Sequence, residues 1–190
     1  MVKAGTKGAK DMAKATDMLM DEHRGIERML GAMERAISRL QAGDATAVPM
    51  FAQGVDFLRG FADRCHHYKE EQHLFPMLAT KGVAVATPVS ELLGEHEKGR
   101  GLIRAMDESV QRAQAGEKAA LKDLAAATSS YIQLLRAHIV KEDAVLQTAD
   151  RTLAPADQKS LAETFERVEV EIMGVGTHER YHQMLDSLEG

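Results

Sequence analysis

Apolar side chains recur at intervals of three and four residues along most of this 190-residue chain. That period is typical of amphipathic helices, which turn one face toward a core. In the first such stretch the series includes Leu19, Ile26, Leu30 and Met33. The chain has no Trp, only 4 Pro and 4% aromatic residues, a composition that disfavours a β-sandwich or barrel. We therefore expect an all-α protein.

Links containing Gly, Pro and Asp divide the apolar pattern into four long helices. Each predicted helix has about 25–30 residues, and short links between helices of similar length favour an antiparallel up-down four-helix bundle. The predicted helices run over about 12–41 and 49–79, from the Thr87-Pro88 pair to Gly116, and from there to the polar stretch before Pro155.

The remaining sequence predicts shorter helices beyond the bundle. Pro155 can start a fifth helix, which Gly174 and Gly176 interrupt before a last helical segment. We expect three parts: an N-terminal tail at 1–11 that is flexible, a bundle at 12–150, and a C-terminal helical extension at 151–190 that packs on the bundle.

Charge and composition argue against several classes of protein. The 24 Lys and Arg against 29 Asp and Glu give a net charge of -5, which is too acidic for a generic nucleic-acid binder. No apolar run approaches the roughly 20 residues of a membrane span, and no secretory signal is visible, so we expect a cytoplasmic protein without a membrane partner. The single cysteine, Cys65, excludes an internal disulfide and an all-Cys metal site.

Each long helix places a histidine on its predicted core face. In the first helix, His23 lies between Leu19 and Ile26 of the apolar stripe. A lone histidine in such a place is most often a hydrogen-bonded core residue, but the other helices repeat the feature. The predicted inward set also contains His96 on the third helix, and His138 and Glu142 on the fourth.

The second helix carries two overlapping His-x-x-x-Glu pairs, His66 with Glu70 and His67 with Glu71. Residues four apart stack on one helical face, so either pair could chelate one ion. His67 and Glu71 continue the apolar series of this helix, and we expect them inside the bundle. We expect His66, Glu70 and His73 on its charged, solvated face.

The predicted core would then bury four imidazoles and two carboxylates, which need compensating positive charge. Each unpaired carboxylate would cost on the order of several kcal/mol. A pair of metal ions, capped by imidazoles and bridged by the two carboxylates, compensates them. Nitrogen and oxygen ligands without thiolate suit iron, manganese or zinc. The alternative is a polar core of His-Glu hydrogen bonds.

Four segments of the chain resemble the hemerythrin-type HHE cation-binding domain. They are DEHRGI around His23, HHYKEEQHLFP around His67 and Glu71, GEHEKGR around His96, and RAHIVKEDAVL around His138 and Glu142. The resemblance covers about 12–150. It implies an antiparallel four-helix bundle around two non-haem iron ions, bridged by oxo or hydroxo, with the ligands His23, His67, Glu71, His96, His138 and Glu142.

The chain also departs from the oxygen-carrying members of that family, which use five histidines and two carboxylates. Two of those histidines lie four apart on the third helix, where this chain has Arg100 at the second place. On the fourth helix carriers typically place Asp five residues after His; here Glu142 and Asp143 are both present, and the helical phase favours Glu142. Either the centre has an open coordination position, or a fifth imidazole comes from His178 or His182. The alternative for these two histidines is a place at the rim of an amphipathic helix that docks on the bundle.

The resemblance implies a protein that binds or reduces oxygen, peroxide or nitric oxide at the metal centre. His and Glu would act as ligands and not as acid-base catalysts, and an oxidoreductase activity is one form of this hypothesis. The alternative is a module that binds, stores or senses iron without turnover. A third hypothesis is a structural domain whose C-terminal helices bind a protein partner.

Overall fold

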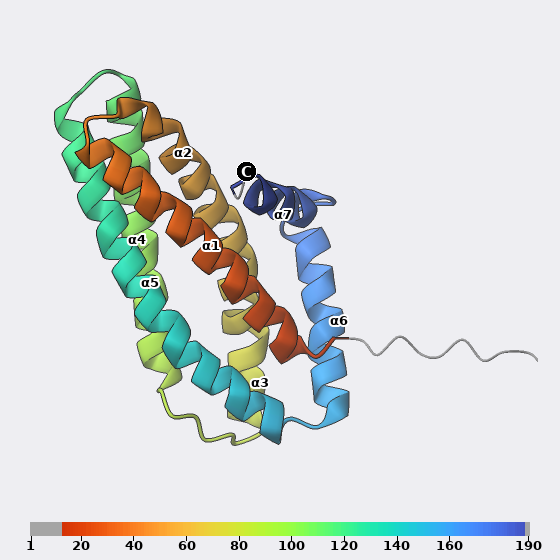
Figure 1. The fold of residues 1–190 in the computed structure, drawn as a ribbon. Helices are drawn as coiled ribbons and strands as arrows, with labels where there is room; N and C mark the ends of the chain where they lie inside the picture. Colours follow the sequence, from red (N-terminus) through yellow and green to blue (C-terminus); the bar gives the residue numbers. More distant parts are fainter. Residues whose placement is uncertain (1–12, 189–190) are drawn as a thin grey trace, which may run out of the picture.

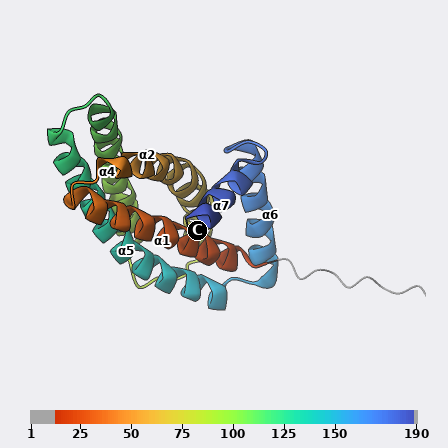
Figure 2. The same cartoon turned by 45° about the horizontal axis from the view of Figure 1, so that its top comes forward.

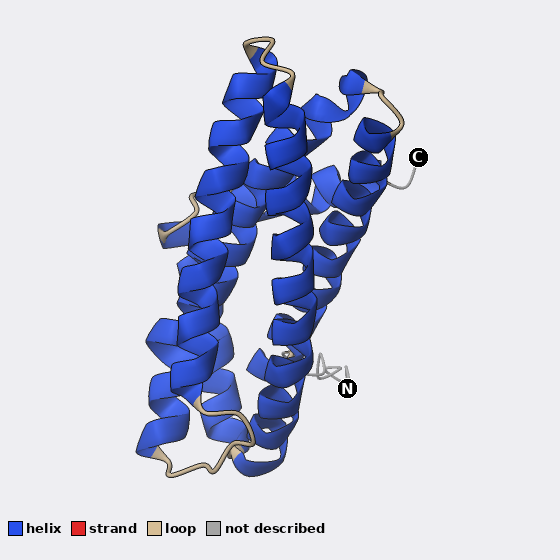
Figure 3. Cartoon of the chain, turned by 90° about the vertical axis from the view of Figure 1, so that its left-hand side faces the viewer, coloured by secondary structure: helices blue, strands red, loops and turns tan. Residues whose placement is uncertain are grey.

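A computed structural model describes residues 13–188 as a helical protein (Figures 1 and 3). These residues contain no strand, which confirms the predicted all-helical fold. The tail predicted at 1–11 lies outside them. The elements are α1 (Ala15–Gln41), the 3-10 turn η1 (Ala45–Ala47), α2 (Val48–Phe57), the π-helical η2 (Leu58–His67) and η3 (Glu70–Leu74), α3 (Phe75–Thr80), α4 (Val89–Gln114), α5 (Ala119–Thr152), α6 (Pro155–Glu171) and α7 (Thr177–Ser187).

Four long helical stretches lie side by side and form a bundle (Figure 1). They are α1, the stretch from α2 to α3, α4 and α5. Helix α5 packs against α1 and α4, and α2 packs against the same two helices, so the four stretches surround a common interior. In the described part of the chain, no helix is both long enough and apolar enough to cross a lipid bilayer.

Buried apolar side chains form two clusters, one in each half of the bundle. On α1, His23 lies between Leu19 of one cluster and Ile26 of the other. The same order of apolar, polar and apolar side chains holds on α4 and α5. A buried polar layer therefore separates two apolar clusters, which shield it from solvent on both sides.

The stretch from α2 to α3 is wound more loosely than an α-helix over much of its length. The Tyr68 amide donates to the Asp63 carbonyl and the Phe75 amide donates to the Glu70 carbonyl, in each case five residues back. Such turns hold more than the 3.6 residues of an α-helical turn. With such wider turns, residues four apart in sequence stay on the same face of the helix. The buried residues of this stretch include a series at intervals of four: Leu58, Ala62, His66, Glu70, Leu74 and Leu78.

Helices α6 and α7 lie beside the bundle and both contact α1 (Figures 1 and 2). Phe165 of α6 is buried in the cluster that contains Leu19. Tyr181 of α7 is buried in the other cluster, and its hydroxyl donates to the Asp56 carbonyl at 3.2 Å. The turn between α6 and α7 uses two glycines with positive φ, which confirms the interruption predicted there: 88° at Gly174 and 78° at Gly176.

Candidate metal centre

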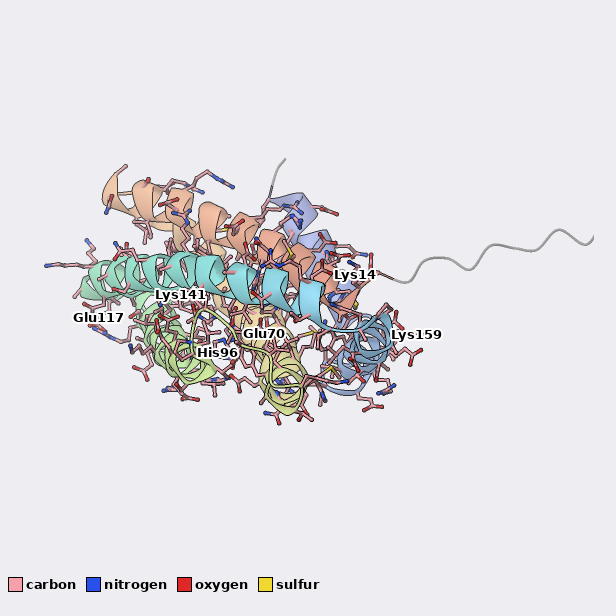
Figure 4. All side chains as sticks on the ribbon, turned by 90° about the horizontal axis from the view of Figure 1, so that it is seen from below. Lys14, Glu70, His96, Glu117, Lys141 and Lys159 are labelled. Atoms are coloured by element: carbon pink, nitrogen blue, oxygen red, sulfur yellow. The ribbon has the colours of Figure 1, made fainter. Side chains whose placement is uncertain are left out.

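The buried polar layer brings seven metal-binding side chains together. None is more than 4% exposed. Figure 4, which views the bundle from below, places two of them, Glu70 and His96, between the helices. The seven are His23 on α1, His66 and His67 on η2, Glu70 on η3, His96 on α4, and His138 and Glu142 on α5.

The ligand atoms of these side chains form two adjacent groups. One consists of His23, His66, Glu70 and Glu142, and the other of His67, His96 and His138. Within each group, one nitrogen or oxygen atom per residue lies within 4.8 Å of the others. Each group therefore has the dimensions of a site for one ion.

The placement of His66 and Glu70 corrects the sequence prediction, which put them on the solvated face. Their side chains are 1% and 0% exposed. The prediction assumed α-helical geometry, in which each step of four residues overshoots a full turn by about 40°. In the π-helical turns of η2 and η3 the rotation per residue is smaller, so residues four apart stay on one face. Both His66 and His67 are buried as a result. His73 is half-buried and lies outside both groups.

Two glutamates connect the groups. Glu142 lies with Oε2 at 3.4 Å from Nε2 of His23 and with Oε1 at 3.3 Å from Nε2 of His96. Glu70 lies with Oε1 at 3.6 Å from Nε2 of His66 and with Oε2 at 3.8 Å from Nε2 of His96. Oε2 of Glu142 is also 2.9 Å from Nε2 of His138, so each of the two carboxylates lies against imidazoles of both groups, where it would help to hold both ions.

Every imidazole of the layer turns Nδ1 toward a carboxylate outside the seven. Four of these contacts are 2.7–2.9 Å long, and the fifth, from His67, is 3.5 Å. Such outer carboxylates fix the orientation and tautomer of metal-binding histidines and increase their basicity. The pairs are His23 with Asp143, His66 with Glu22, His67 with Asp63, His96 with Glu71, and His138 with Glu95.

Because an ionised carboxylate only accepts hydrogen bonds, we assign a proton to Nδ1 of the four rings with contacts of 2.7–2.9 Å, so that Nε2 is the nitrogen that would bind a metal. Nε2 atoms of His96 and His138 then face each other at 3.0 Å. Two lone pairs at this distance repel each other unless a proton or a metal cation lies with them. The arrangement of the rings is therefore one that a cation stabilises.

The pKa shifts indicate which groups of the layer favour the protonated form. Burial alone would lower the pKa of His23, but the adjacent carboxylates of Asp143 and Glu142 raise it to about 9. Burial, together with the nearby Glu142 carboxylate, raises the pKa of Glu70 well above its ordinary value. Burial lowers the pKa of His66 to about 4, which keeps this ring in the neutral form that binds metal.

Several buried atoms of the layer have no hydrogen-bond partner in the described structure. They are Nε2 of His23, Nε2 of His66, Nδ1 of His67, both carboxylate oxygens of Glu70, and Oε2 of Glu142. Buried polar atoms are nearly always hydrogen-bonded or bound to an ion, so these atoms indicate a missing partner. Five imidazoles and two carboxylates without a thiolate form a donor set that fits iron, manganese or zinc.

Glu71, which the sequence analysis placed among the ligands, lies on the outer side of His96. Its Oε1 is 2.7 Å from Nδ1 of His96 and 2.7 Å from Nη2 of Arg100. Nε of Arg100 also donates to Oδ1 of Asp63 at 2.8 Å. Arg100, at the position where oxygen carriers have a histidine, thus holds the two carboxylates that face His67 and His96.

The structure does not bring His178 or His182 into either group. Nε2 of His178 lies 3.6 Å from Oε1 of Glu22 and 3.6 Å from Oε1 of Glu169. The ring of His182 packs against Phe61, with ring centroids 5.9 Å apart. The fifth imidazole of the layer comes instead from the adjacent pair His66 and His67.

Three of the outer carboxylates, Glu22, Asp63 and Glu95, were not predicted from the sequence. Two of them immediately precede a histidine, in the dipeptides Glu22-His23 and Glu95-His96. Each contacts a histidine of a neighbouring helix and not the one beside it, since Glu22 faces His66 and Glu95 faces His138. The repeated Glu-His dipeptide was the available signal, but its meaning depends on how the helices pack.

Most of the chain is similar to a known domain family. The profile of the hemerythrin HHE cation-binding domain matches residues 14–149. Uncharacterized proteins of Mycobacterium tuberculosis and Mycobacterium bovis are 32% identical over 153 residues, which cover 80% of this chain. The chain spans 60% of the length of these relatives. No solved structure matches the chain significantly.

Proposed function

Because the chain belongs to the hemerythrin HHE cation-binding domain family, we propose that it holds two iron ions in an antiparallel up-down four-helix bundle. Five of the ligands are those expected from the sequence: His23, His67, His96, His138 and Glu142. We add His66 and Glu70 to this set. Glu71, in this proposal, orients His96 from outside and does not bind metal.

The observation that carries the proposal is the common orientation of the five imidazoles. Each ring turns Nδ1 toward an outer carboxylate. In four of the rings, those of His23, His66, His96 and His138, Nε2 lies 2.9–3.8 Å from a buried oxygen of Glu70 or Glu142. A core held together by His-Glu hydrogen bonds alone would not leave both oxygens of Glu70 without a partner.

We further propose that the centre binds or reduces a small molecule of the class of oxygen, peroxide or nitric oxide. Bound iron would supply Lewis acidity and a redox couple. The two groups are unequal, since His23 and His66 provide two imidazoles and the other group provides three. The first group therefore leaves room for an outside ligand, and the near-complete burial of all seven side chains restricts that ligand to a very small molecule.

The protein's own residues would support this chemistry in two ways. The outer carboxylates accept from Nδ1, which leaves Nε2 as the nitrogen that would bind a metal and holds each ring in place. The two apolar clusters on either side of the layer exclude water, which strengthens electrostatic interactions inside.

The test is metal analysis of protein purified from iron-replete cells, followed by optical spectra before and after addition of oxygen, peroxide or nitric oxide. We expect two iron ions per chain and charge-transfer bands that change on addition. Two bound ions with an unchanging spectrum would favour an iron storage or sensing module. Protein that folds fully and binds no iron would contradict the proposal.

A further inference from the structure

Lys69, next to the candidate metal centre, has a completely buried side chain. Its ammonium lies 2.5 Å from Oε1 of Glu22 and 2.7 Å from Oε1 of Glu169. The other oxygen of Glu22 lies 2.8 Å from Nδ1 of His66. A continuous chain of charged contacts therefore leads from Glu169 on α6 to an imidazole of the metal centre.

We propose that the C-terminal extension is part of the metal centre: Glu169 holds the Lys69 ammonium against Glu22, and Glu22 in turn fixes the His66 imidazole. This inference rests on the proposed function, since it assumes that His66 binds metal. It assigns Lys69 and Glu169 as positioning residues that act through Glu22.

The geometry leaves Lys69 few alternatives. A buried ammonium is stable only when carboxylates pair with it, and Glu22 and Glu169 are its two ion-pair partners within the described residues. Its remaining surroundings are apolar on one side, where the ammonium lies 5.7 Å from the centroid of the Phe165 ring. Without Glu169, Lys69 would lose one of these two ion-pair partners.

Helix α7 adds a second contact from the extension to the same place. Nε2 of His178 lies 3.6 Å from the Glu22 and Glu169 oxygens that contact Lys69. The profile of the family domain ends at residue 149, so Glu169 and His178 both lie beyond it. These contacts are thus a feature of this chain that the match to the domain does not account for.

The experiment compares iron release from Glu169→Ala and Glu166→Ala. Glu166 is also on α6 but is exposed, so its variant controls for a change of helix composition. Both proteins are loaded with iron, and release to an excess of chelator is followed by loss of the optical bands. Thermal unfolding of the metal-free variants is measured in parallel, because a purely structural role would change unfolding and leave the release rate as in the control.

Loss of a carboxylate in direct contact with a metal-binding histidine typically weakens metal affinity about 10–100-fold. Glu169 acts one contact further away, so we expect Glu169→Ala to release iron about three- to tenfold faster than wild type, and Glu166→Ala to match wild type. Glu169→Gln, which keeps an acceptor for Lys69, should lie between them.

Equal release rates for Glu169→Ala and Glu166→Ala would overturn the inference. If Glu169→Ala does not fold, the same comparison is decided with Glu169→Gln. A wild-type protein that holds iron while the variants show no difference contradicts this inference alone. A wild-type protein that holds no iron contradicts the proposed function, and this inference with it.

Discussion

Nε2 of His96 and Nε2 of His138 lie 3.0 Å apart, although each ring has its Nδ1 on a carboxylate. His67 joins them, with its ring stacked on that of His96 at a centroid distance of 3.9 Å. The Nε2 lone pairs of His96 and His138 repel each other unless a proton or a cation lies with them. A bound cation would satisfy both nitrogens, so the metal content of variants is the most direct test of this arrangement.

The corrected position of His66 gives the first prediction. We expect His66→Ala to reduce bound iron below two ions per chain, because it removes one of the two imidazoles in its group. His73→Ala, seven residues further along the same stretch, should keep two ions, since His73 lies outside both groups. Elemental analysis of the purified variants checks this. Two ions in His66→Ala would show that burial of this ring is structural only.

The neighbouring glutamates Glu70 and Glu71 should behave differently when each is changed to Gln. Glu70→Gln removes a charged bridge between the groups, and we expect the variant to lose at least one ion. Glu71→Gln keeps an acceptor for Nδ1 of His96 and for Arg100, so we expect both ions to remain, with affinity reduced about 10-fold or more. Iron titration followed by absorbance distinguishes the two effects. The assignment fails if Glu71→Gln is the variant that loses an ion.

Removal of metal should destabilise the fold. A ligand present at about 1,000 times its dissociation constant stabilises a protein by about 4 kcal/mol. For a chain of this length each kcal/mol shifts the Tm by about 2–4 °C, so we expect chelation to lower the Tm by about 10 °C. Differential scanning calorimetry before and after chelation checks this value. An unchanged Tm would indicate that protons balance the negative charge of Glu70 and Glu142 no less effectively than metal ions do.

The hydrogen bonds from Arg100 to Asp63 and Glu71 give a prediction on stability. Arg100→Met removes hydrogen bonds to Asp63 and Glu71 from a partly exposed site, so we expect the free energy of unfolding to fall by about 1–2 kcal/mol. Arg59→Met removes an exposed contact to Asp107 and should cost less than about 0.5 kcal/mol. Urea denaturation of both variants measures the difference. Equal costs would mean that Arg100 is an ordinary surface cation.

The helices and most of the polar layer were predictable because apolar periodicity reports directly on which face of an α-helix is buried. His23, His96, His138 and Glu142 follow that period, and all four are buried as expected. His66 does not, because its position depends on π-helical turns that change the period. Nothing in a local pattern of side chains indicates where such turns occur, although the overlapping His-x-x-x-Glu pairs point to this stretch of the chain.

The partners of each imidazole were less predictable for a different reason. Glu22 contacts His66 across 44 positions of sequence, and Glu95 contacts His138 across 43. Such contacts depend on the rotation of one helix against another, which short-range spacing does not determine. The sequence therefore predicts the ligands more reliably than the carboxylates that orient them.

Docking of α7 depends on the absence of a side chain at Gly60. A Cβ atom there would lie 2.0 Å from the hydroxyl oxygen of Tyr181, whose ring also packs against Phe57. In a helix interior Ala is favoured over Gly by about 1 kcal/mol, but overpacking a buried contact costs about 1–3 kcal/mol. We expect the clash to dominate, so Gly60→Ala should displace α7 and speed hydrogen exchange of its amides.

Gly94→Ala is the control, because a Cβ at this position meets open space. It should stabilise the protein by about 0.5–1 kcal/mol. Equal protection of the α7 amides in both variants would show that Tyr181 does not hold this helix.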